Sequence, residues 1–126
     1  MRWRGLRVDG KSWQLARWNP VREKVEKIKV GLFGVIASSG PEINHYSEDL
    51  SWHHIIDPNT LRPPMLWSQV TVLGAGENVT AMDSDILSTA TFTLPAEKIK
   101  QMLKSSYPLY KVWVVDLKGK TQLVKP

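Results

Sequence analysis

The spacing of apolar residues changes twice along this chain of 126 residues. In the first two-thirds, bulky and polar side chains mostly alternate over short segments, which is the pattern of half-buried β-strands. From about Asp83 the apolar residues recur at the spacing of one helix face, at Ile86, Leu87, Ala90 and Leu94. Alternation returns near the C-terminus. Strands on both sides of a helical region predict an α+β fold.

We expect a mostly antiparallel sheet of about five or six strands, with two helices on one of its faces. The expected strands are Ser12–Trp18, Val25–Ala37, Trp52–Ile56, Trp67–Leu73, Leu109–Asp116 and Thr121–Val124. Val25–Ala37 is predicted as one long or kinked strand. Asp83 or Ser84 is expected to cap the first helix. Thr93 is expected to cap the second, with Pro95 in its first turn.

Length and composition limit the possible classes of protein. A chain of 126 residues is expected to form one domain, residues 1–126. It has no cysteine, which excludes a disulfide framework, a thiolate nucleophile and a Cys-ligated zinc or iron–sulfur centre. No apolar run approaches the roughly 20 residues that span a bilayer. The basic N-terminus lacks the apolar core of a signal peptide and a lipid-anchoring Cys, so a cytoplasmic location is expected.

The net charge of +5 is unevenly distributed. Residues 1–30 carry nine Lys or Arg and three acidic residues, whereas the rest of the chain is close to neutral. Basic residues interleaved with Trp3, Trp13 and Trp18 could bind nucleic acid, since cations pair with phosphates and aromatic rings stack on bases. The alternative, which we favour, is a solvated strand edge protected by its charges.

Asp85 and Thr89 lie four residues apart on the expected first helix, so their oxygens share one face. A carboxylate and a hydroxyl are hard ligands that suit Mg²⁺, which takes few protein oxygens and completes its shell with water and phosphates. The alternative is structural. An acidic residue in the first turn stabilises a helix, and a Thr four residues later is often at the surface. The spacing alone leaves both interpretations open.

Other polar residues have weaker patterns. His53 and His54 are neighbours on an expected strand, so they should point to opposite faces, with one of them facing a site. The segment from Asp57 to Thr60 has the composition of a capped turn. Ser39, before Gly40, could present a hydroxyl group to an anion. A P-loop, a Rossmann fingerprint and a GxSxG elbow are absent.

Four short segments, taken in order, resemble one family. They are Ser38–Gly40 (SSG), Trp52–Thr60 (WHHIIDPNT), Gln69–Val72 (QVTV) and Ser84–Ala90 (SDILSTA). This order resembles the C-terminal half of the ApbE family, the FAD:protein FMN transferases formerly called thiamine-biosynthesis lipoproteins. That family has a T-S-G turn, a Y-H-H-I-I-D-P-x-T-G segment, an S-V-T-V strand and an A-D-x-L-S-T-A helix. Gly10–Pro20 resembles its G-x-x-W-x-x-x-x-x-x-P strand more loosely.

The resemblance implies an enzyme that binds FAD with magnesium, cleaves the diphosphate and passes FMN to a threonine hydroxyl of an acceptor flavoprotein, releasing AMP. Some members instead hydrolyse FAD to FMN and AMP. By position in the family segments, Asp85 and Thr89 would hold Mg²⁺, and Ser39, His54 and Asp57 would contact or support the flavin nucleotide. No residue is assigned as the general base. A metal that stabilises charge at a breaking phosphorus–oxygen bond is usual in such transfers.

The sequence also departs from the family pattern. The K-G-aromatic-A-V-D and N-x-G-G-D segments of the family's N-terminal half do not occur. Leu61 replaces the Gly after D-P-x-T, and Ser84 replaces the Ala before the helix Asp. We therefore expect a truncated FMN transferase that is weakly active or inactive alone. The alternative is a non-catalytic flavin-nucleotide-binding or interaction module, completed by self-association or by a partner chain.

Overall fold

A computed structural model describes residues 1–126 and divides them into two antiparallel sheets and two helices. The larger sheet has the order β1-β4-β5-β6-β7. Its strands are β1 (Arg2–Arg4), β4 (Phe33–Ser39), β5 (Gln69–Ala75), β6 (Tyr110–Val115) and β7 (Thr121–Val124). The smaller sheet is a hairpin of β2 (Leu15–Asn19) and β3 (Lys24–Ile28). The α+β class is confirmed, with one or two strands more than expected.

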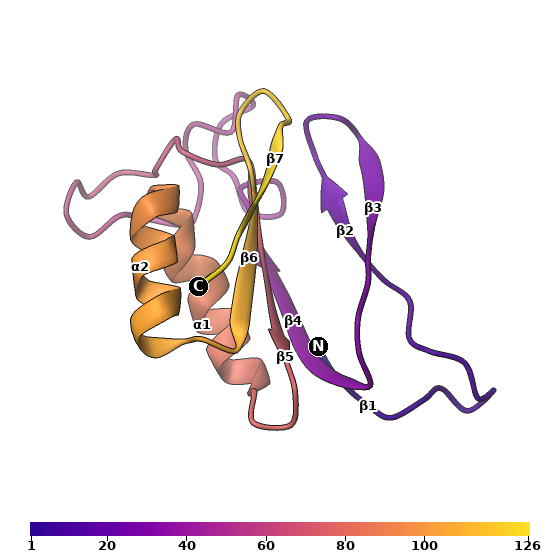
Figure 1. The fold of residues 1–126 in the computed structure, drawn as a ribbon. Coiled ribbons are helices and arrows are strands. Elements are labelled where there is room, and N and C mark those ends of the chain that lie inside the picture. Colours follow the sequence, from indigo (N-terminus) through magenta and orange to yellow (C-terminus); the bar gives the residue numbers. More distant parts are fainter.

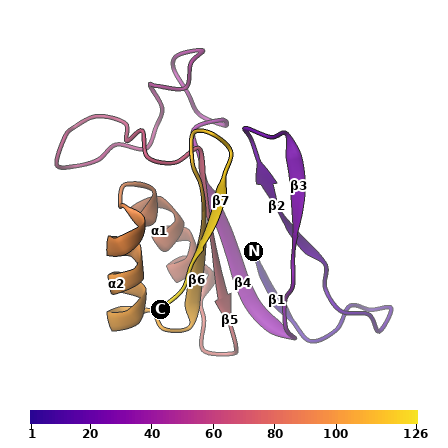
Figure 2. The ribbon, with the colours of Figure 1, turned by 45° about the horizontal axis from the view of Figure 1, so that its top comes forward.

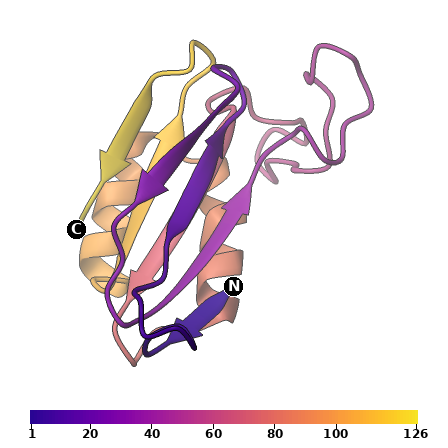
Figure 3. The ribbon, with the colours of Figure 1, turned by 90° about the vertical axis from the view of Figure 1, so that its right-hand side faces the viewer.

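The elements form three layers (Figure 1). As predicted, α1 (Ala81–Phe92) and α2 (Ala96–Ser106) cover one face of the five-stranded sheet. The β2–β3 hairpin lies over the other face, in front of the sheet in Figure 3. Because successive side chains of a strand point to opposite faces, one strand contributes to both apolar clusters. Val70 and Val72 of β5 pack toward the helices, whereas Leu73 packs under the hairpin. Neither helix has the length and apolar run that crossing a membrane requires.

Two apolar clusters hold the layers together. The larger one contains 13 buried residues between the sheet and the helices, including Phe92 and Leu103. The smaller one lies under the hairpin and consists of Trp3, Leu15, Ile28 and Leu73. Burying one such side chain stabilises a fold by about 1.5–3 kcal/mol relative to leaving it exposed. The helix-side cluster therefore contributes most of the apolar stabilisation.

A polar network joins the hairpin to the end of the larger sheet. The Arg17 guanidinium of β2 forms an ion pair with Glu26 of β3 and donates to Thr121 Oγ1 at 3.4 Å. Asn19 Nδ2 donates to the Gly119 carbonyl of the β6–β7 turn at 3.0 Å. Burial disfavours the charged carboxylate, but the Arg17 charge, the Asn19 hydrogen bond and Lys24 together outweigh burial, and the pKa of Glu26 is lowered. The Arg17 side chain is therefore engaged in contacts that join the hairpin to the larger sheet.

Two strand predictions were wrong, and one strand was missed. Val25–Ala37 is not one strand, because β3 ends at Ile28 and β4 begins at Phe33 in a different sheet. Trp52–Ile56 forms only a single bridge, between His45 and His53. A strand needs a neighbour, and the flanking strands β4 and β5 pair with each other instead. The missed strand is β1, whose short basic sequence shows little apolar alternation.

The helix caps also differ from the predictions. Thr80, rather than Asp83 or Ser84, caps α1, and its hydroxyl accepts a hydrogen bond from the Asp83 N–H at 3.0 Å. Thr93 ends α1 instead of capping α2, whose N-cap is Pro95. The predicted start of α1 was therefore late, because the polar residues at its N-terminus belong to the helix itself.

The face of α1 toward the sheet is partly polar. Its buried residues are Ser84, Leu87, Ser88, Thr91 and Phe92. Ile86, which was expected on the apolar face, is 56 % exposed. Ser84 donates to the Val72 carbonyl of β5 at 3.1 Å. The helix is thus positioned by hydroxyl groups as well as by apolar packing, which explains why apolar spacing identified its buried face only in part, at Leu87.

The segment between β4 and β5, residues 40–68, leaves the sheet and extends beyond its end (Figure 2). Both ends of the segment are held at one place, because β4 and β5 pair in a register that includes Ser39 with Val70. Within the segment, the hydroxyls of Ser47 and Ser51 donate to Asp49 Oδ1 and hold the pKa of Asp49 at about 2. The same segment carries His54 and Asp57.

Candidate functional site

Three hydroxyl groups meet where β4 ends against α1. Ser39 is the last residue of β4, and its Oγ lies 2.7 Å from Ser88 Oγ and 3.2 Å from Thr89 Oγ1. Ser88 is fully buried and donates to the Asp85 carbonyl at 2.9 Å. The structure therefore brings together Ser39 and Thr89, two of the predicted site residues. It adds Ser88, which belongs to the SDILSTA segment but was not assigned to the site, because its burial depends on the packing of β4 against α1.

Asp85 lies one turn before Thr89 on α1, and both side chains are exposed. Residues four apart on a helix share a face, so the carboxylate and the hydroxyl lie on one side. Asp85 makes no ion pair. The chain has no group of three or more His, Asp or Glu residues that could hold a metal ion. Two hard oxygens fit a cation such as Mg²⁺, which completes its shell with water and phosphate oxygens.

An open cavity of about 620 Å³ lies beside this part of α1. Its lining residues are Thr89 and Ala90 of α1, Thr93 and Leu94 just after α1, and His54, Ile55, Ile56 and Pro58 of the 40–68 segment. Asp85 precedes the lining residues by one helical turn. The volume and the apolar lining with a few polar groups are those of a small-molecule site. Thr89 and His54 therefore line the same cavity, although they lie far apart in the sequence.

The two neighbouring histidines have different surroundings, as predicted. His54 is exposed and lines the cavity, and its Nδ1 lies 3.0 Å from the Asn44 carbonyl. Because a carbonyl only accepts, Nδ1 carries the hydrogen and Nε2 of the neutral ring keeps a lone pair. His53 is 2 % exposed and packs edge-on against Phe92, with ring centroids 5.7 Å apart. His53 thus belongs to the core, and His54 to the site.

The burial of His53 makes the stability depend on pH. Burial lowers the pKa of His53, the charge of His54 lowers it further, and a hydrogen bond with the Pro64 backbone opposes the shift. Below about pH 7 the unfolded chain then binds more protons than the folded one. We expect the free energy of unfolding, measured in urea titrations, to fall as the pH is lowered from about 7 to 5, with a slope that corresponds to the uptake of at most one proton. His53→Gln should remove this slope. An unchanged slope in the variant would assign the effect to another group.

Asp57 occupies a turn rather than the cavity wall. Its Oδ1 accepts from the backbone N–H and the side-chain amide of Asn59, at 2.9 and 3.1 Å, and its backbone bridges to Arg62. These are the contacts of a capped turn. Its neighbours Ile56 and Pro58 line the cavity. Asp57 therefore shapes that wall, and a direct contact between Asp57 and a nucleotide stays a prediction.

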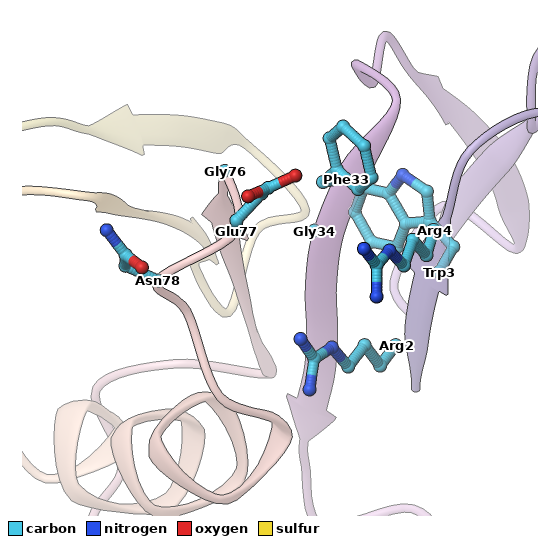
Figure 4. Close-up of a pocket in the computed structure, with 8 residues that line it drawn as sticks. All are labelled: Arg2, Trp3, Arg4, Phe33, Gly34, Gly76, Glu77 and Asn78. Carbon is cyan, nitrogen blue, oxygen red and sulfur yellow. The ribbon is translucent and has the colours of Figure 1, made fainter.

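A second cavity, of about 270 Å³, lies at the other end of β4. Arg2 and Arg4 point toward it, with Glu77 across from them (Figure 4). Trp3, between the two arginines, is 4 % exposed and is part of the cluster under the hairpin. Trp3 therefore cannot stack on a base, and Arg17 is occupied by Glu26. The burial of these two side chains weakens the case for nucleic-acid binding.

The fold is an α+β domain with an open cavity at the margin of its helix layer. The sequence model of the ApbE family matches residues 1–113, and the chain belongs to this family. This agrees with the resemblance of the four sequence segments. No curated protein matches the chain.

Solved structures of ApbE proteins share the fold. The chain is similar to an ApbE protein from Thermotoga maritima, with a TM-score of 0.77 and 25 % identity over 95 % of this chain and 38 % of that one. It is similar to the flavin transferase ApbE from Vibrio cholerae, with a TM-score of 0.69 and 26 % identity over 98 % and 39 % of the two chains. The flavinyl transferase ApbE from Pseudomonas stutzeri has the same fold, with a TM-score of 0.62 and 24 % identity over 97 % and 38 %. The chain thus spans 38–39 % of each of these structures.

Proposed function

We propose that this chain forms the C-terminal part of an FAD:protein FMN transferase site, in which FMN moves from FAD to a threonine of an acceptor flavoprotein and AMP is released. One observation carries the proposal: the exposed turn of α1 with Asp85 and Thr89 borders a cavity that His54 also lines. Membership of the ApbE family and likeness to a flavin transferase support the flavin substrate.

The residues of the site then have distinct roles. Asp85 and Thr89 would hold Mg²⁺, which supplies positive charge to the diphosphate oxygens during cleavage. His54 presents a polar ring edge to the nucleotide from the opposite wall, and Ser39 fixes the Thr89 hydroxyl at 3.2 Å. The apolar lining, which includes Ile56 and Leu94, keeps water away from the flavin.

Residues outside this chain complete the pocket in our proposal. The chain spans 38–39 % of its structural neighbours and offers two protein oxygens to the metal. The 40–68 segment exposes large apolar side chains, since Ile43, Tyr46 and Leu61 are 89, 78 and 77 % exposed. Such exposure is typical of a surface that another part of a protein covers. The rest of the same polypeptide, a second copy or a partner chain would supply the cover, and residues 1–126 alone would be weakly active or inactive.

Removing the Asp85 carboxylate tests the proposed site. Asp85→Ala is expected to weaken the binding of FAD in the presence of Mg²⁺ by about tenfold or more, because Asp85 would be one of two protein ligands that hold the ion on the phosphates. The melting temperature should change little, since Asp85 is exposed. Calorimetric titrations with FAD, with and without Mg²⁺, measure the effect. Glu97→Ala, which removes an acidic residue from the first turn of α2, is the matched control and should bind FAD like the wild type.

A different outcome would support the second function. FAD affinity that is independent of Mg²⁺ and survives Asp85→Ala would describe a non-catalytic flavin-nucleotide-binding module. The partial coverage of the solved ApbE structures is the observation that favours this alternative. A large fall in the melting temperature of Asp85→Ala, with unchanged FAD binding, would make Asp85 a structural residue of the helix.

A further inference from the structure

Hydrogen bonds connect the backbone carbonyl of Asp85 to the side chain of Thr89 through a chain of hydroxyls. The chain begins at the Asp85 carbonyl, which accepts from Ser88 Oγ at 2.9 Å. Ser88 Oγ lies 2.7 Å from Ser39 Oγ, and Ser39 Oγ lies 3.2 Å from Thr89 Oγ1. Exposure increases along it, because Ser88 is fully buried, Ser39 is half-buried and Thr89 is exposed.

The direction of these three bonds follows from counting hydrogens. Each hydroxyl has one hydrogen, and a carbonyl oxygen only accepts. Ser88 therefore spends its hydrogen on the Asp85 carbonyl and must accept from Ser39. Ser39 has then used its hydrogen and must accept from Thr89. Only this order forms all three bonds at once, and it leaves the Thr89 oxygen with no hydrogen pointing to solvent.

We propose that Ser88 is a positioning residue that orients the Thr89 hydroxyl so that its lone pairs face the outer side of α1. A hard cation is bound through lone pairs, and a hydroxyl hydrogen directed at it would be repelled. The Asp85–Thr89 turn is thus prepared for a cation before one arrives. That the cation is the Mg²⁺ of a flavin transferase rests on the proposed function, whereas the direction of the bonds does not.

The burial of Ser88 makes the arrangement stable. A fully buried hydroxyl cannot exchange its partners for water, so its bonds to the Asp85 carbonyl and to Ser39 are costly to break. In Ser88→Ala the Ser39 hydrogen loses its acceptor and turns to Thr89. The Thr89 hydrogen is then displaced outward, onto the side where the cation binds. Partners behind a metal ligand commonly change metal affinity by about 10- to 100-fold.

Neutron diffraction from deuterium-exchanged crystals of the full chain tests the direction itself, without any metal. We expect the deuterium of Ser88 toward the Asp85 carbonyl, that of Ser39 toward Ser88, and that of Thr89 toward Ser39. Deuterium of Thr89 directed to solvent, with that of Ser39 directed to Thr89, would overturn the proposal.

Titration with Mn²⁺, followed by the relaxation rate of water protons, tests the consequence for a cation. Ser88→Ala and Ser39→Ala are each expected to weaken Mn²⁺ binding about tenfold, the low end of the usual range for such partners. Ser105→Ala is the matched control, because Ser105 makes the same kind of bond to the carbonyl three residues earlier, Met102, but on α2. It should leave the affinity unchanged. Thermal melts verify that each variant is folded.

A double-mutant cycle separates positioning from a general structural effect. Thr89→Val removes the hydroxyl on which Ser88 is proposed to act, so Ser88→Ala should have no further effect on Mn²⁺ affinity in that background. Equal losses in both backgrounds, or no loss in the wild-type background, would overturn the role of Ser88. Failure of the proposed metal site is a separate result. In that case Asp85→Ala would leave the Mn²⁺ affinity unchanged, whichever directions of the hydrogen bonds the neutron structure shows.

Discussion

Replacing Phe92 with alanine is expected to lower the free energy of unfolding by about 3–5 kcal/mol. Phe92 is fully buried at the end of α1, in the apolar cluster between the helices and the sheet. Its ring also contacts the ring of His53, at 5.7 Å between centroids. Alanine would leave a cavity among all these groups and loosen the 40–68 segment from α1. In thermal unfolding the melting temperature should fall by roughly 10 to 20 °C.

Ile86 provides the control on the same helix. It was predicted from its spacing to be part of the core, but it is 56 % exposed. Ile86→Ala should therefore change the free energy of unfolding by no more than about 0.5 kcal/mol. Equal losses for the two variants would mean that α1 is rotated relative to the arrangement described above, and the positions of Asp85 and Thr89 would have to be reconsidered.

Replacing Gly34 with alanine should destabilise the protein by about 2–3 kcal/mol, through overpacking rather than through a cavity. A Cβ at Gly34 would lie 2.4 Å from the Trp3 ring and 2.6 Å from the Gly74 carbonyl oxygen. Trp3 is buried under the hairpin, and Gly74 belongs to the paired strand β5, so neither group can move away easily. β1 should be displaced from β4 in the variant, which a loss of amide protection at residues 2–4 would reveal.

Gly31→Ala is the matched control for this prediction. A Cβ at Gly31 meets nothing within 4 Å, and Gly31 has no positive φ. Its melting temperature should equal that of the wild type or exceed it slightly, since alanine reduces the freedom of the unfolded chain. A Gly34→Ala protein as stable as the Gly31→Ala protein would show that Trp3 does not pack over β4.

Local sequence patterns were sufficient where an element is positioned by apolar residues alone. α2 has Ile99 and Leu103 on one face and Pro95 at its N-cap, and both its existence and its buried face agree with the structure. Tyr110, Val112 and Val114 alternate along β6 and are buried, and β6 forms the expected hairpin with β7. In α2 and β6 the apolar side chains that show the period are also the ones that are buried.

Elements whose positions depend on distant partners could not be predicted in the same way. α1 buries Ser84, Ser88 and Thr91 beside its apolar residues, so apolar spacing alone does not mark its inner face. The division of residues 25–37 between two sheets depends on which strands pair, and no local pattern records it. For the candidate site, the family segments indicated Ser39 and Thr89, which the structure places 3.2 Å apart. Ser88 was missed because its role depends on the hydroxyl of Ser39, at the end of β4.

The long connection between two adjacent strands has an evolutionary consequence. The pairing of β4 with β5 clamps both ends of residues 40–68, whatever lies between them. Changes in this segment away from the buried His53 and Ile55 would remodel one wall of the cavity without shifting the helix that bears Asp85. Selection can therefore vary this connection while the residues of the opposite wall stay unchanged.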